Sequence, residues 1–277
     1  MTQTRTDRTW INFARYGCIV GVFLAATGLS ADTVEAQTYA RVSVKFVLDG
    51  SGNRPSSGSY QTDQHVIDAI DLANTALTNM GADWQLHLTE IVDVSGISQW
   101  FNTACADKAA MEAAAEAAPS TYAWRSNAIN IYVVNDLDVC GGVCSFPHGG
   151  DDIILIQSVG GILNGGIGWL HELGHYFSLY HTFECFSGNW NTAISTEPGG
   201  NAGGVSQACL DSCPQTYNVM SYNSGLTGSN AIFSACQLGL IAQEMDPNIG
   251  DRYAVVAQGD HLTVDTISSP AAGTPFS

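Results

Sequence analysis

An α/β fold is expected for this chain of 277 residues, because segments with the two-residue period of strands alternate with segments of helical period. Strand, helix and strand patterns follow one another between residues 42 and 94. Two short apolar runs further on are typical of buried strands. The composition, with 45% hydrophobic and 13% charged residues, is that of a globular protein. The length allows one sizeable core or two small ones, and one domain is the default expectation.

The first elements are delimited by turn residues. Residues 42–48 (VSVKFVL) alternate and lead into the turn-rich DGSGNRPSSGS, which predicts a strand followed by a surface loop. Thr62 or Asp63 is suited to cap a helix over DQHVIDAIDLANTALTNM, which Gly81 would end. Residues 84–94 (WQLHLTEIVDV) alternate again and predict a second strand. Its side chains expected on one face are Trp84, Leu86, Leu88 and Ile91.

The middle of the chain continues this alternation. An alanine-rich helix is predicted over residues 107–118, and buried strands are predicted over 128–134 (AINIYVV) and 152–156 (DIILI). A glycine-rich stretch, 160–168, then leads into a further helix.

The last third of the chain changes in composition. Residues 187–229 are rich in Gly, Asn, Ser and Cys, so this segment is expected to rely on cross-links and ions. A last helix is predicted over 234–245 and a strand pair over 253–267. We assign residues 37–250 to the main domain and 251–277 to a C-terminal tail that is partly disordered.

The first 36 residues have the features of a secretory signal peptide. Three arginines, Arg5, Arg8 and Arg15, precede an apolar run over residues 16–26, and small residues suited to cleavage follow. The triplet before Gln37 fits the small-x-small rule, which places the mature start there. An uncleaved membrane anchor is the alternative. No later segment has the roughly 18 apolar residues that a span requires, so a secreted protein without a membrane contact is expected after cleavage.

The net charge limits the classes of binding partner that are expected. It is −17 at pH 7, and a nucleic-acid partner is not expected because phosphate binding needs a basic surface. The acidity serves solubility or, as the alternative, binding of a structural Ca²⁺.

Eight cysteines are present, and removal of the leader with Cys18 leaves seven. In an oxidising compartment most are expected to pair. Of the three possible pairings after residue 181, we favour Cys185–Cys213 with Cys209–Cys236. Cys140 with Cys144 would close a small loop and leave Cys105 free.

The stretch WLHELGHYFSLYHTF contains His171, Glu172 and His175 in the spacing HExxH, followed by His181. Positions i and i+4 of a helix lie about 40° apart around the axis and about 6 Å along it, so His171 and His175 can share one metal ion. A straight helix would carry His181 away from that ion. The helix must therefore break near Ser178, which would bring a third imidazole to a zinc ion and leave a position for water.

On these motifs, together with INIYVV, GGVCSFP, DDIILI, NVMSY and FSACQLGLIAQEM, the sequence resembles the metzincin peptidases, and among them the pappalysin-like family, over about residues 129–245. The resemblance implies a twisted mixed sheet, two long helices above the cleft and an irregular, disulfide-linked lower part. It implies that Met220 packs beneath the histidines without binding the metal. Tyr222 matches a tyrosine that approaches the metal or the reacting carbonyl; a buried structural tyrosine is the alternative.

The sequence departs from the family pattern at two places. Ser178 replaces the glycine of HExxHxxGxxH, and the Asp-rich stretch of many relatives is not evident after His181. We expect the bend to persist, with the helix ending within a residue or two of Ser178 and the Ser178 hydroxyl bonding a nearby backbone group.

The resemblance and the motif together predict a secreted zinc endopeptidase with Glu172 as catalytic base and a protein or peptide as substrate. We expect a monomer. Two alternatives stay open: a module that binds zinc without turnover, and a zinc amidase acting on small or cell-wall substrates.

Overall fold

The computed structural model describes residues 38–138, 142–143, 153–158, 166–179, 217–220 and 226–258. Within these ranges six strands form one sheet in the order β2-β1-β3-β5-β4, with β6 beside β1. The strands are β1 (Thr38–Val47), β2 (Trp84–Val94), β3 (Ile129–Val134), β4 (Gly142–Val143), β5 (Ile153–Gln157) and β6 (Val256–Gln258). Strands β2, β1, β3 and β5 are parallel, whereas β4 runs antiparallel to β5 and β6 antiparallel to β1. The predicted mixed sheet is therefore confirmed.

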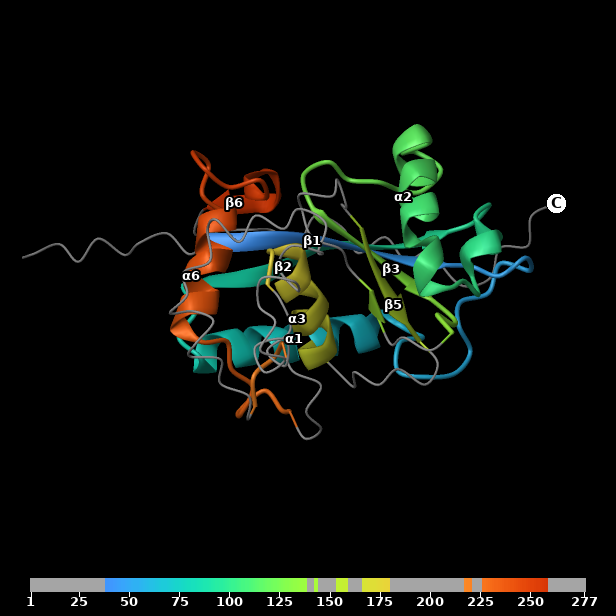
Figure 1. Cartoon of the computed structure of the whole chain (residues 1–277). Coiled ribbons are helices and arrows are strands. Elements are labelled where there is room, and N and C mark those ends of the chain that lie inside the picture. Colours follow the sequence, from blue (N-terminus) through green and yellow to red (C-terminus); the bar gives the residue numbers. More distant parts are fainter. Residues whose placement is uncertain are drawn as a thin grey trace, which may run out of the picture. The chain divides into compact units, whose positions relative to one another are not determined.

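Helices cover both faces of this sheet (Figure 1). They are α1 (Asp63–Asn79), α2 (Lys108–Ala117), α3 (Gly166–Tyr176) and α6 (Ala235–Glu244). Short 3₁₀ turns precede α2, at Ser98–Trp100 and Cys105–Asp107, and β6, at Tyr253–Val255. Side chains of α1, α3 and α6 share one buried apolar cluster with Val42, Val44 and Phe46 of β1. Side chains of α2 form a second cluster with Val47 and Tyr132. The alternation of the strands thus directs successive residues of β1 to opposite layers.

Several predicted elements lie within one to four residues of the observed ones. Helix α1 begins after Thr62, whose hydroxyl accepts a hydrogen bond from the His65 amide, and it is followed by Gly81 at φ +76°. None of the described helices is long and apolar enough to cross a membrane. Strand β6 lies in the stretch where a strand pair was predicted, but its partner is β1. The cysteine-rich segment 187–216 lies outside the described residues.

Strand β2 contains a bulge that explains which of its side chains are buried. The register passes from Val42 opposite Leu88 to Ser43 opposite Glu90, so Thr89 is the extra residue. Its hydroxyl donates to the Val42 carbonyl over 2.8 Å. An extra residue reverses the alternation, and Ile91 is therefore buried like Trp84 and Leu86. The predicted common face is confirmed for these three residues.

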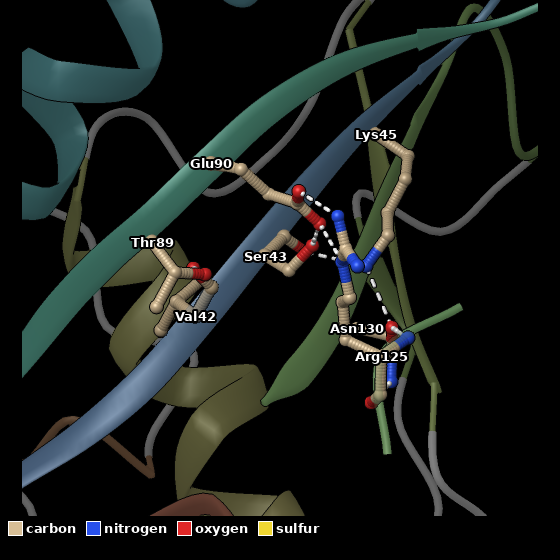
Figure 2. A network of polar contacts seen from close by, with 7 residues as sticks. All are labelled: Val42, Ser43, Lys45, Thr89, Glu90, Arg125 and Asn130. Atoms are coloured by element: carbon tan, nitrogen blue, oxygen red, sulfur yellow. Dashed lines mark hydrogen bonds and ion pairs between the residues drawn. The ribbon is translucent and has the colours of Figure 1, made fainter. Parts of the chain in front are cut away.

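The face of the sheet that packs against α2 holds a network that we call the polar cluster: Ser43, Lys45, Glu90, Arg125 and Asn130 (Figure 2). Arg125 binds the Glu90 carboxylate through two nitrogens, at 2.7 and 2.6 Å, and the Ser43 hydroxyl donates to the same carboxylate. The Lys45 ammonium donates to Asn130 Oδ1 over 2.6 Å and to the Ser43 carbonyl over 3.1 Å. The polar cluster joins β1, β2 and β3 to the loop before β3.

Candidate metal centre

Helix α3 holds the first two predicted ligands and the predicted base. From Ile167 to Phe177 every residue is buried, so both the apolar and the polar residues of this helix lie in the interior. His171, Glu172 and His175 are 2%, 4% and 6% exposed. The two imidazole rings lie 4.8 Å apart between centroids and are nearly perpendicular, at 87°. The predicted helical spacing therefore brings the two rings together.

Backbone carbonyls orient both imidazoles. His171 Nδ1 lies 2.7 Å from the Val219 carbonyl oxygen, and His175 Nδ1 lies 2.7 Å from the Leu179 carbonyl oxygen. A carbonyl oxygen can only accept, so Nδ1 carries the proton in both rings. That tautomer presents the lone pair at Nε2, which is the nitrogen a metal ion would take. The described pair thus fits a zinc site of imidazole nitrogens.

Met220 packs against the α3 backbone between these histidines. It is fully buried, and a Cβ added to Gly174 would lie 2.3 Å from the Met220 sulfur. A residue with a Cβ at position 174 would therefore force the buried methionine to shift. This contact agrees with the packing role predicted for Met220.

Glu172 lies beside strand β4. A Cβ added to Gly142 would lie 3.0 Å from Glu172 Cγ and Oε1. Among the described strands β4 is at the end of the sheet, so the carboxylate lies next to an edge strand that runs antiparallel to β5. A Cβ at position 142 would therefore press against the Glu172 side chain.

The chain bends where the family pattern has glycine. Helix α3 ends at Tyr176, and Ser178 has a positive φ of 67°. The amides of Phe177 and Leu179 both bond to carbonyls of the last turn, at 3.0 and 2.9 Å. The predicted helix end is confirmed. The predicted backbone partner of the Ser178 hydroxyl is wrong, because Ser178 Oγ donates to Glu244 Oε1 of α6 over 2.8 Å.

Other predicted residues lie outside the described ranges. These are His181, Tyr222, Cys140, Cys144, Cys185, Cys209 and Cys213, together with the side chain of Cys236. Within the described ranges no group of three or more His, Cys, Asp or Glu side chains is arranged to hold a metal ion, so the His181 and Ca²⁺ predictions stay predictions. Cys105 is disulfide-bonded, and the prediction that it is free is wrong. Pairing of Cys140 with Cys144, which was predicted from their closeness in sequence, lies outside the described residues and stays a prediction.

Sequence reasoning missed the contacts that hold the segment 217–220, which we call the Met220 loop. Asn218 is fully buried, and its Oδ1 accepts from the Met220 amide over 2.9 Å. Its Nδ2 donates to Gln237 Oε1 over 2.8 Å. An asparagine two residues before Met220 was the available signal, because asparagine readily bonds the backbone two residues on. The partner Gln237 has no local signal.

Comparison with known proteins identifies similar chains. No protein-family model matches. An extracellular metalloprotease of Sordaria macrospora is 30% identical over 223 residues, which are 73% of this chain and 72% of that protein. An extracellular metalloprotease of Neurospora crassa is 32% identical over 117 residues, 34% of this chain and 41% of that protein. The solved structure of mirolysin in complex with a compound has a TM-score of 0.51 at 17% identity, over 79% of this chain and 96% of that chain, which is a likeness of fold.

Proposed function

The chain belongs to the extracellular metalloprotease family, and from this premise we propose that it is a secreted, pappalysin-like zinc endopeptidase. The observation that carries the proposal is the orientation of two buried imidazoles by the carbonyls of Val219 and Leu179. The proposed ligands are His171, His175 and His181. Residues 1–36 would direct secretion, and residues 37–250 would form the catalytic domain.

The proposed chemistry assigns one role to each of the chain's own groups. Bound zinc would supply a Lewis acid that makes water acidic near neutral pH and polarises the peptide carbonyl. Glu172 would accept the proton of that water and deliver it to the leaving amine. The Tyr222 hydroxyl would donate a hydrogen bond to the oxygen on which negative charge develops. The burial of Glu172 next to the metal ligands suits a group that exchanges protons only with substrate and water.

Strand β4 is the proposed platform for the substrate. It lies at the end of the described sheet and beside Glu172. An extended peptide bound along such an edge would be held by main-chain hydrogen bonds, which favours peptides over small amides. We therefore propose a protein or peptide substrate for this chain.

The test compares Glu172→Gln with wild type on casein. The substitution removes the base and no ligand, so zinc content and Tm should stay unchanged while kcat/KM falls roughly 10²- to 10⁴-fold. Glu116→Gln on the exposed side of α2 is the matched control and should keep full activity.

The other outcomes separate the alternatives. Casein cleavage that survives 1,10-phenanthroline would exclude a metalloprotease. Bound zinc without any turnover would indicate a binding module, and hydrolysis of small amides but not of casein would indicate an amidase. Full activity of Glu172→Gln would exclude Glu172 as the base.

A further inference from the structure

Helix α6 has two polar side chains that bond to two different segments around the candidate metal centre. Gln237 and Glu244 are seven residues apart, which is about two helical turns, so they lie on the same flank of α6. We call these two residues the α6 pair. Gln237 bonds to the Met220 loop, and Glu244 bonds to the bend after α3.

The first link runs from Gln237 to His171 in short steps. Gln237 Oε1 accepts from Asn218 Nδ2 over 2.8 Å, and Asn218 Oδ1 accepts from the Met220 amide over 2.9 Å. The Asn218 side chain is thereby held on both sides, and it fixes the turn that contains Val219. The Val219 carbonyl is the acceptor that orients His171. A shift of this turn would therefore rotate the imidazole.

The second link runs from Glu244 to the segment that orients His175. Glu244 Oε1 accepts from the Ser178 hydroxyl over 2.8 Å, and the Glu244 carbonyl accepts from the Arg252 amide over 3.0 Å. Arg252 is buried, donates through Nε to the Tyr176 carbonyl over 3.2 Å, and stacks over the Tyr176 ring at 4.1 Å. The end of α3 is thus held from two sides. Leu179, whose carbonyl orients His175, is the next residue after Ser178.

Ser178 gives this second link its importance. At φ 67° a serine occupies the left-handed region, which costs a residue with a Cβ more than it costs glycine. The bond to Glu244 offers a specific stabilisation of that conformation. The neighbouring turn is also closely packed, because a Cβ on Gly250 would lie 2.1 Å from the Glu244 carbonyl oxygen.

We propose that Gln237 and Glu244 are positioning residues that hold the Met220 loop and the α3 bend at a fixed separation, so that the Val219 and Leu179 carbonyls keep both imidazoles in the orientation that binds metal. This inference rests on the proposed function. It assigns to α6 a specific task in metal binding beyond its apolar packing through Ile241.

The test measures the zinc dissociation constant by competition with a chelator in full-length Gln237→Ala and Glu244→Ala. Loss of an outer contact of a metal-binding histidine weakens affinity about 10- to 100-fold. We expect weakening of about tenfold in each variant, together with a changed Co²⁺ absorption spectrum. Glu244→Gln keeps an oxygen that accepts from Ser178, and Gln237→Glu keeps the oxygen that accepts from Asn218, so both should restore most of the affinity.

Two controls separate positioning from stability. Gln237→Ala also disturbs the N-terminal cap of α6, because Gln237 and Ser234 bond to each other. Ser234→Ala removes this cap and leaves the bond to Asn218 in place. Gln243→Ala changes an exposed residue at the other end of α6. Both should bind zinc as wild type does. In a Ser178→Gly background Glu244→Ala should lose most of its effect, because glycine takes the bend without help.

Zinc affinities of both alanine variants within twofold of wild type would overturn the proposal, as would equal losses in Ser234→Ala and Gln237→Ala. A wild-type protein that binds no zinc would instead contradict the proposed function.

Discussion

Two polar groups on opposite faces of the sheet, the polar cluster and the candidate metal centre, are built in different ways. In the polar cluster the side chains bond to one another as well as to the backbone, and the charges of Arg125 and Glu90 meet within it (Figure 2). At the candidate metal centre the two imidazoles donate to backbone carbonyls, which fixes how each ring is turned. The polar cluster satisfies the hydrogen-bonding groups of its own side chains, whereas the contacts at the candidate metal centre set the ring orientation that the proposed metal binding needs. Damage to the first should therefore affect stability, and damage to the second should affect metal binding.

The ionisable groups of the polar cluster show this mutual dependence. Burial lowers the pKa of the Lys45 ammonium well below its usual value, an effect that the Glu90 charge partly offsets. Burial by itself would raise the pKa of the Glu90 carboxyl, but hydrogen bonds from Arg125 and Ser43 outweigh it and leave that pKa lowered. Each group therefore titrates according to its neighbours in the cluster.

The largest effect on stability is expected from Asn130→Ala. The Asn130 side chain accepts from Lys45 and from the Arg125 amide, and it donates to the carbonyls of Arg125 and Ala128. Its removal leaves several buried groups without these bonds and should lower the free energy of unfolding in urea by roughly 3 kcal/mol. Zinc affinity should not change. Asn127→Ala, an exposed change in the same loop, should cost less than about 0.5 kcal/mol.

An equal loss of zinc affinity in Asn130→Ala would contradict the separation between the two polar groups. So would a loss of stability no larger than that of Asn127→Ala.

Gly174→Ala tests whether the close packing of Met220 against α3 supports the candidate metal centre. The added Cβ would overlap the buried Met220 sulfur, which should cost about 1–3 kcal/mol of stability. Because Met220 follows Val219 directly, displacement of the methionine should also weaken zinc binding, by about tenfold or more. Gly239→Ala in α6 meets no atom within 4 Å and is the matched control. It should stabilise the protein by up to about 1 kcal/mol.

Adding Met220→Ala to Gly174→Ala should recover part of the lost zinc affinity, because the smaller side chain makes room for the Cβ. Zinc binding that is identical in Gly174→Ala and Gly239→Ala would refute the packing argument.

Local patterns predicted most of the described elements and the helical part of the metal centre. Alternation indicated the strands, and the i, i+4 spacing placed His171 and His175 together. Long-range contacts had no such signal. The Ser178 partner, Glu244, is 66 residues away, and the acceptors of the imidazoles are carbonyls that every residue has. The disulfide of Cys105 was mispredicted because sequence distance between cysteines does not determine which of them meet.

Lys45→Met is expected to have the smallest effect on stability at neutral pH, and its main effect should be on how stability depends on pH. The variant removes a buried ammonium, while Asn130 Oδ1 keeps its bond from the Arg125 amide, so the free energy of unfolding should change by less than about 1.5 kcal/mol. In wild type the pKa of Lys45 is lowered in the folded state from its ordinary 10.5. Between these two pKa values the unfolded chain binds more protons than the folded one, so wild-type stability should rise with pH across that window. Below the lowered pKa both states carry the proton, and the contribution is constant. Urea unfolding at several pH values up to about 10.5 should therefore show a slope in wild type that Lys45→Met lacks, and equal slopes would mean that Lys45 does not titrate as its burial requires.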